Sequence, residues 1–166
     1  MVIRGTQKLL KELGVPGQEP AAHEQEPPPL FEWYGNLIRI ERRKCLVFVE
    51  SSTLFTFMIP AVTKARYREF RKLFLDHLAF ALHAVGVQLG NADFAERISF
   101  ARTRDRRIIG SMNDLIFQLT HDIAWVGGLR HADPVDVIRR VNRTPMTLID
   151  SSPDRAIREC IGSPYN

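Results

Sequence analysis

The segment NLIRIERRKCLVFVESSTLFTFMIP, residues 36–60, decides the fold class of this protein. It contains three runs rich in β-branched and aromatic residues, at 36–40, 45–50 and 53–59, joined by the polar links ERRK and SS. Runs of this composition are typical of strands, and links this short are typical of hairpins. The segment therefore predicts an antiparallel meander that ends at Pro60, since proline has no N–H for a sheet ladder.

Two helices are predicted to pack on this meander. Residues 64–86 carry apolar side chains at helical spacing, which predicts the longest helix of the chain, lying across the sheet. The segment RISFARTRDRRIIG, residues 97–110, is predicted to form a second hairpin, and Ser111 to cap a helix over 111–126. We therefore expect an α+β fold: an antiparallel sheet of about five or six strands in two hairpin groups, with both helices on one face.

The rest of the chain fits a single domain over residues 1–166, because this length is enough to bury a sizeable core. Residues 1–4 are strand-like, and Thr6 is expected to cap a short helix. A Pro-rich surface loop is expected over about 14–32, where Pro, Gly, Glu and Gln interrupt the apolar pattern. Near the C-terminus, Asp133 followed by proline predicts the start of another helix.

Composition and cysteine usage favour a cytoplasmic globular protein. Hydrophobic residues make up 45% and charged residues 25% of the chain, without an apolar run long enough for a membrane span or a signal peptide. Cys45 and Cys160 form no CxxC pair, and the five histidines are not at metal-ligand spacing. We therefore expect a cytoplasmic protein with no membrane association, no metal and no cofactor.

A family resemblance is carried by three blocks that occur in one order. They are IRGTQKLLKELG at 3–14, the meander segment at 36–60, and FARTRDRRIIGSMNDL at 100–115. On these blocks the chain resembles a widespread microbial family of short uncharacterised proteins, a domain of unknown function. The resemblance weakens after Val126, and it implies neither a reaction nor a catalytic residue.

The helix predicted over 111–126 has an unusual outer face. Its apolar side chains form one conventional core face. The opposite arc gathers Asp114, Phe117, His121 and Trp125, with Gln118 beside them. Two aromatic side chains are poor candidates for a solvated face, so we expect another part of the fold or a second subunit to cover this arc.

Three interpretations of this arc remain open: a structural one, a catalytic one, and ligand binding without catalysis. In the first, Asp114 completes a capping box with Ser111, and His121 is a partly buried, hydrogen-bonded histidine. In the second, the arc is the wall of a hydrolase-like site. Asp114 is about two turns from His121, however, and no GxSxG motif or other nucleophile signature is present.

Two clusters of basic residues are predicted at hairpin turns. Arg42 and Arg43 lie in the first, whereas Arg104, Arg106 and Arg107 lie in the second. The net charge is +4, and two tips at the same end of the sheet would form a basic strip for phosphates. Tips at opposite ends would be solvated turns. Since no aromatic residue is interleaved to stack on bases, we expect at most weak, salt-sensitive nucleic-acid binding.

These patterns favour a non-catalytic binding or regulatory module whose protein partner or second copy binds at the Phe117 and Trp125 face. The alternatives are a hydrolase-like enzyme that uses the His121 face and a weak nucleic-acid-binding protein that uses the basic turns. A pocket that joins His121 to a nucleophile would favour the enzyme, and a continuous basic strip would favour nucleic acid.

Overall fold

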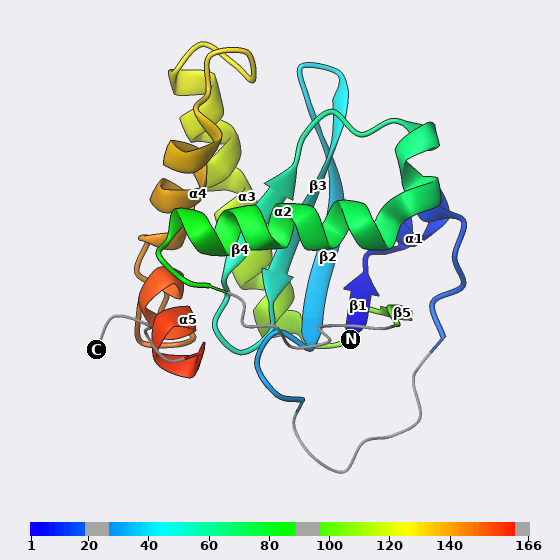
Figure 1. The fold of residues 1–166 in the computed structure, drawn as a ribbon, viewed down its shortest axis with the longest axis horizontal. Helices are drawn as coiled ribbons and strands as arrows, with labels where there is room; N and C mark the ends of the chain where they lie inside the picture. The colour runs from blue at the N-terminus through cyan, green and yellow to red at the C-terminus, as the bar shows by residue number, and fades with distance from the viewer. Residues whose placement is uncertain (19–26, 89–96, 162–166) are drawn as a thin grey trace.

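The predicted meander is present in the computed structural model of the protein (Figure 1). It consists of β2 (Glu32–Ile40), β3 (Arg43–Glu50) and β4 (Thr56–Ile59), each antiparallel to the next. Glu41 and Arg42 form the turn between β2 and β3 with positive φ angles of 48° and 67°, which matches the twist of a two-residue hairpin. The structure describes three stretches of the chain: 1–18, 27–88 and 97–161.

The complete sheet is mixed, which corrects the expected antiparallel sheet with two hairpin groups. β1 (Val2–Gly5) pairs in parallel with β2 on one side and with β5 (Ser99–Arg102) on the other. The order of the five strands in the described chain is β4-β3-β2-β1-β5. The segment predicted as a second hairpin therefore supplies one strand, β5, and then enters a helix.

That helix, α3 (Arg106–Trp125), begins earlier than residue 111, and its N-cap is Asp105 rather than Ser111. The Asp105 carboxylate accepts the backbone N–H of Arg107 at 2.8 Å. Ile108 already belongs to the buried face, so the residues predicted as a returning strand are the first turn of an amphipathic helix. The capping box predicted at Ser111 is therefore wrong.

The helix expected over 64–86 is also divided. Lys64–Glu69 forms a 3₁₀ helix, η1, and α2 (Phe70–Ala84) follows it, so α3 is the longest helix among the described residues. None of the six residues of η1 is buried, and the apolar packing that stabilises an α-helix begins only at Phe70. Gly86, with φ of 79°, follows the C-terminal end of α2.

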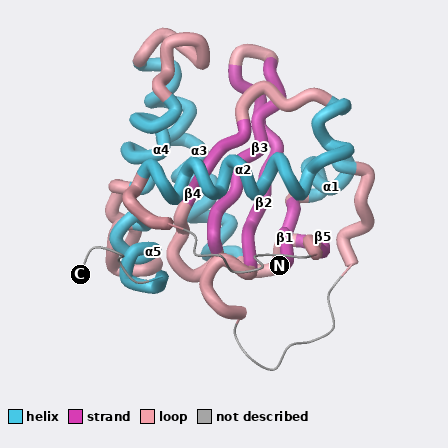
Figure 2. The backbone as a smooth tube through the Cα atoms, viewed as in Figure 1, coloured by secondary structure: helices cyan, strands magenta, loops and turns pink. Residues whose placement is uncertain are grey.

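Helices cover both faces of the sheet, so the expectation that the two helices share one face is wrong. α2 lies across the front of the sheet and α3 lies behind it (Figures 1 and 2). Successive strand residues point to opposite faces. Trp33 packs in the core beneath Phe74 of α2, and the next residue, Tyr34, packs in the core with Met112 of α3. Each helix therefore has its own core.

The C-terminal helices complete the fold at the β4 side. α4 (Pro134–Asn142) contributes Ile138 to the core beneath α2 and Val141 to the core beneath α3. Asp133 caps it as expected by accepting backbone N–H groups of its first turn. α5 (Pro153–Ile161) follows α4. Because α4 belongs to both cores, it joins the two helical layers.

The N-terminal elements agree with the sequence. Thr6 caps α1 (Gln7–Leu13), and its hydroxyl accepts the backbone N–H of Leu9 at 3.4 Å. Of the loop expected over 14–32, residues 19–26 lie outside the described residues. The described part of that loop contains no helix or strand before β2 begins.

Candidate ligand-binding groove

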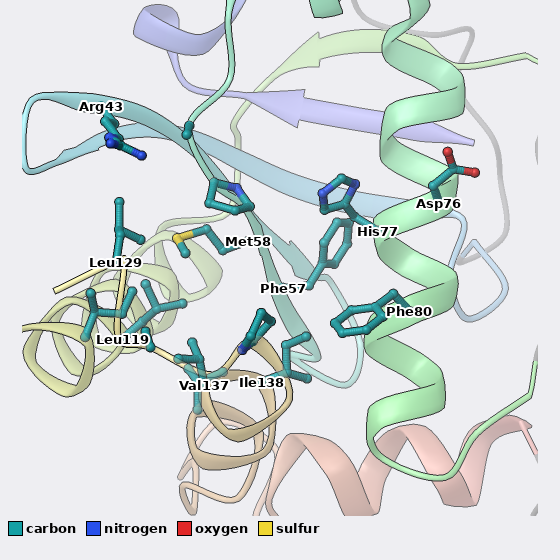
Figure 3. A pocket seen from close by; sticks show the side chains of 16 residues that line it. Arg43, Phe57, Met58, Asp76, His77, Phe80, Leu119, Leu129, Val137 and Ile138 are labelled. Atoms are coloured by element: carbon teal, nitrogen blue, oxygen red, sulfur yellow. The ribbon is translucent and has the colours of Figure 1, made fainter. Parts of the chain in front are cut away.

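An apolar groove opens at the β4 edge of the sheet, between α2 on one face and α3 and α4 on the other (Figure 3). Its volume of about 510 Å³ is within the range of sites that bind small molecules. Its apolar lining includes Phe57, Met58, Phe80, Leu119, Val137 and Ile138. Since these side chains come from four elements, the groove is a product of their packing.

The floor of the groove is the outer edge of β4. At one end of this strand, the backbone N–H and C=O of Thr56 bind the side-chain amide of Asn142, each at 2.7 Å. Alternate residues of an antiparallel strand turn their peptide groups to the same side. The N–H and C=O of Met58 therefore face the groove, which gives its floor one donor and one acceptor.

Arg43 supplies positive charge at one end of the groove, where β3 begins (Figure 3). In the part of the chain that the structure describes, no carboxylate forms an ion pair with its guanidinium. A guanidinium group can bind a carboxylate or another planar anion through two parallel hydrogen bonds. This end of the groove is therefore suited to an anion.

His77, on the α2 wall, is a second side chain that gives the groove a polar group. Its ring atom Nδ1 lies 2.8 Å from the carbonyl oxygen of Leu73, and a carbonyl only accepts, so Nδ1 carries the proton. The other ring nitrogen, Nε2, is then left for a ligand, and Figure 3 shows the ring extending from α2 toward the β4 side. The neighbouring Asp76 also lines the groove, and its carboxylate pairs with Lys72 at 2.6 Å.

The model of a family described as a domain of unknown function, DUF6933, matches residues 2–156. The chain belongs to the DUF6933 family. The match spans the whole sheet and every groove residue named above, and it confirms the domain-of-unknown-function family expected from the sequence. No curated protein matches the chain. None of the helices described in this DUF6933 domain is long and apolar enough to cross a membrane.

The outer arc of α3, which carries Asp114, Phe117, His121 and Trp125, is exposed. Phe117 and Trp125 are 73% and 79% exposed, and no described element of the domain covers their rings. The side chain of His121 is 65% exposed, so the expected partly buried histidine is wrong. Gln118, beside the arc, is half-buried and accepts a hydrogen bond from the Thr144 hydroxyl at 2.6 Å.

The positions of Asp114 and His121 do not favour a catalytic site. Both lie on the outer surface of α3, separated by about 10 Å along the helix axis. Neither lines the groove beside β4. The described residues contain no group of three or more His, Cys, Asp or Glu side chains that could hold a metal ion.

The two basic clusters lie at opposite ends of β2, and only the first is at a hairpin turn. Arg42 and Arg43 are at the tip between β2 and β3. Arg104 pairs with Glu32, at the start of β2, at 3.2 Å. Arg107 pairs with its neighbour Asp105 at 3.0 Å, and Arg106 is exposed in the first turn of α3. The ends of β2 are about 25 Å apart, so the clusters form no continuous strip.

A buried polar cluster near the start of α3 was not predicted. Arg4 and Glu32 form an ion pair at 2.5 Å with side chains only 3% and 10% exposed. Tyr34 accepts the backbone N–H of Asp105, and burial raises the pKa of its phenol. These residues meet because β1 and β2 pair in parallel beneath α3. Strand alternation predicts on which face Arg4 lies, but not that this face is buried.

Proposed function

We propose that this member of the DUF6933 family is a non-catalytic binding module whose ligand has an apolar body and an anionic end. The groove beside β4 carries this proposal, because it combines apolar walls with an unpaired Arg43 at one end. Burial of the apolar body would supply most of the affinity. Arg43 would bind the anion and fix the orientation of the ligand in the groove.

Two further polar groups support a defined orientation. The peptide group of Met58 lies between the apolar walls, and His77 contributes a ring nitrogen from α2. A ligand that left these groups without hydrogen-bond partners would bind more weakly, because removing the groups from water costs free energy. We therefore expect a ligand with a polar atom near its middle to bind better than a purely aliphatic one.

The other functions suggested by the sequence have less support. A hydrolase-like site would need a nucleophile near His121, which lies on the exposed outer surface of α3. Nucleic-acid binding would need the two basic clusters to act together across the length of β2. A cytoplasmic location belongs to the same proposal, since Cys45 and Cys160 are both free thiols.

The proposal is tested with decanoate as the probe, measured by displacement of the fluorescent apolar anion anilinonaphthalene sulfonate. The parent protein should bind decanoate more tightly than decanol, which has the same chain without the charge. Arg43→Gln should reduce this preference by about tenfold, because a charged hydrogen bond is lost. Arg42→Gln is the matched control, since Arg42 is the adjacent arginine and does not line the groove.

A second pair of variants tests whether the apolar part of the groove is the site. Ala132 lines the groove and is half-buried, so Ala132→Phe should occupy the space and abolish dye binding. Ala79→Phe makes the same change at an exposed position of α2 that is not in the groove lining and should leave binding intact. Equal dye and decanoate binding by the parent and all four variants would contradict the proposal.

A further inference from the structure

One stripe of residues runs along the exposed side of α3. At about 100° per residue these positions fall within an arc of roughly 80°. The stripe consists of Gly110, Asp114, Phe117, His121 and Trp125, all of them exposed. Its two aromatic rings are the most exposed large apolar side chains of the described chain. A surface of this kind is typical of a contact with another protein.

The two ends of the stripe are complementary in shape. Gly110 has no side chain, and nothing lies within 4 Å of the position that a Cβ atom would take. It is therefore a gap in the helix surface. Trp125, at the other end, carries the bulkiest side chain of the stripe. The two residues are about 22 Å apart along the axis, so an antiparallel helix pair would bring each indole ring over the glycine of the other copy.

The inner residues of the stripe are complementary in charge and hydrogen bonding. Asp114 and His121 have the same midpoint as Gly110 and Trp125, between Phe117 and Gln118. In the antiparallel pair that aligns the ends, each carboxylate therefore faces an imidazole of the other copy. An imidazole N–H donates to a carboxylate whether the ring is neutral or protonated. A parallel pair would instead place carboxylate beside carboxylate.

We infer that two copies of this chain pair through this stripe, with the α3 helices antiparallel about a twofold axis between Phe117 and Gln118. One axis satisfies both sets of contacts, and the Phe117 rings meet close to it in a stacked or edge contact. The antiparallel arrangement also places opposite ends of the two helix dipoles side by side. The inference goes beyond the proposed ligand site, because the stripe faces away from the groove that Leu119 lines.

The contact is small. Each aromatic side chain of the stripe can bury about 150–250 Å², so one copy contributes less than the roughly 800 Å² of a standard protein interface. We therefore expect a weak dimer whose population rises with protein concentration in the micromolar range.

Sedimentation velocity of the parent across low micromolar to about millimolar concentration tests the pairing. Trp125→Ala should raise the dissociation constant at least about tenfold, because it removes the side chain that fills the gap. Gly110→Lys should do the same by blocking the gap, although the monomer has room for the new side chain and lysine favours a helix. Ala79→Lys, at an exposed position of α2, is the control and should leave the dimer unchanged.

Disulfide cross-linking tests the register, in a Cys160→Ser background that removes the exposed native thiol. A mixture of Asp114→Cys and His121→Cys chains should cross-link, since these positions face each other. Neither variant alone should do so, because identical positions lie about 10 Å apart along the axis and a disulfide needs Cα atoms within about 7 Å. A parent that stays monomeric throughout, a dimer insensitive to Trp125→Ala and Gly110→Lys, or faster cross-linking within one variant would overturn the inference.

Discussion

The helical layers on the two faces of the sheet use aromatic residues in opposite ways. Beneath α2, Phe74 makes edge contacts with Phe48, Phe57 and Trp33 at centroid distances of 4.9, 5.3 and 5.5 Å. Beneath α3, the buried helix side chains are aliphatic or Met, and the helix's own aromatic residues lie on its outer side. Both helices are amphipathic, yet only α2 uses its rings to build a core.

This difference indicates that the aromatic residues beneath α2 stabilise the folded chain, whereas those on the outer side of α3 are available to contact another molecule. Buried edge-to-face rings add stability to the area that they bury, so the α2 layer depends on its aromatic cluster. The exposed rings of α3 contribute nothing comparable to the single chain, because water surrounds them in both the folded and unfolded states. Their effect should appear when a second surface covers them.

The largest expected effect is on the α2 side. Phe74→Ala should lower the free energy of unfolding by about 3–5 kcal/mol, because the ring is fully buried and its removal leaves a cavity. Phe117→Ala, the same change on the outer side of α3, should cost no more than about 0.5 kcal/mol at low protein concentration. Urea unfolding measures both, and equal losses would remove the contrast between the two layers.

An intermediate effect is expected where α4 joins the layers. Asn142 is fully buried and binds both backbone groups of Thr56. Asn142→Ala leaves those groups without partners and should cost about 2 kcal/mol or more. Asn113→Ala, at an exposed position of α3, is the matched control. Thermal unfolding reports the loss, and faster hydrogen exchange of the Thr56 amide would locate it. Unchanged exchange at Thr56 would contradict the assigned role.

The smallest expected effect concerns the start of α3. Asp105→Ala should destabilise the protein, whereas Ser111→Ala should change its stability by less than about 0.5 kcal/mol, because only Asp105 is the N-cap. Hydrogen bonding to Arg107 lowers the pKa of the Asp105 carboxyl from 3.8. Its contribution is therefore fully present above pH 3.8 and is lost as the pH falls through the lower folded value.

Urea unfolding of the parent and Asp105→Ala at several pH values provides the measurement. The difference between the two proteins should be constant at neutral pH and shrink in acid below pH 3.8. A larger loss in Ser111→Ala than in Asp105→Ala would restore the later helix start that the sequence first suggested.

Much of the local structure could be predicted because it depends on neighbours in the sequence. The meander follows from alternating β-branched and aromatic residues with short polar links, and Thr6 and Asp133 cap helices through backbone groups two or three residues away. The prediction of a strand around Ile108 is wrong because two adjacent isoleucines fit a strand as well as a helix. Only the continuation of the pattern into α3 distinguishes the two.

The candidate site was far less predictable. Among the residues that line the groove, sequence patterns indicate a functional role only for Arg43, and for a different reason, its place in a basic turn. Phe80, Leu119 and Val137 are ordinary apolar positions on three helices, and nothing in their spacing indicates that they share a cavity. Their convergence depends on α2 lying on one face of the sheet and α3 and α4 on the other.

The sequence by itself determined the meander, the α+β class and the amphipathic stripe of α3, because each rests on periodicity or capping within a few residues. Only the tertiary structure decided that β1 pairs in parallel with β2 and β5, which buries Arg4 with Glu32 and places helices on both faces. It also decided that the groove is open and that the rings of Phe117 and Trp125 are uncovered. Pairing between distant strands and exposure of a helix face depend on how the rest of the chain packs. The spacing of residues within one segment does not predict that packing.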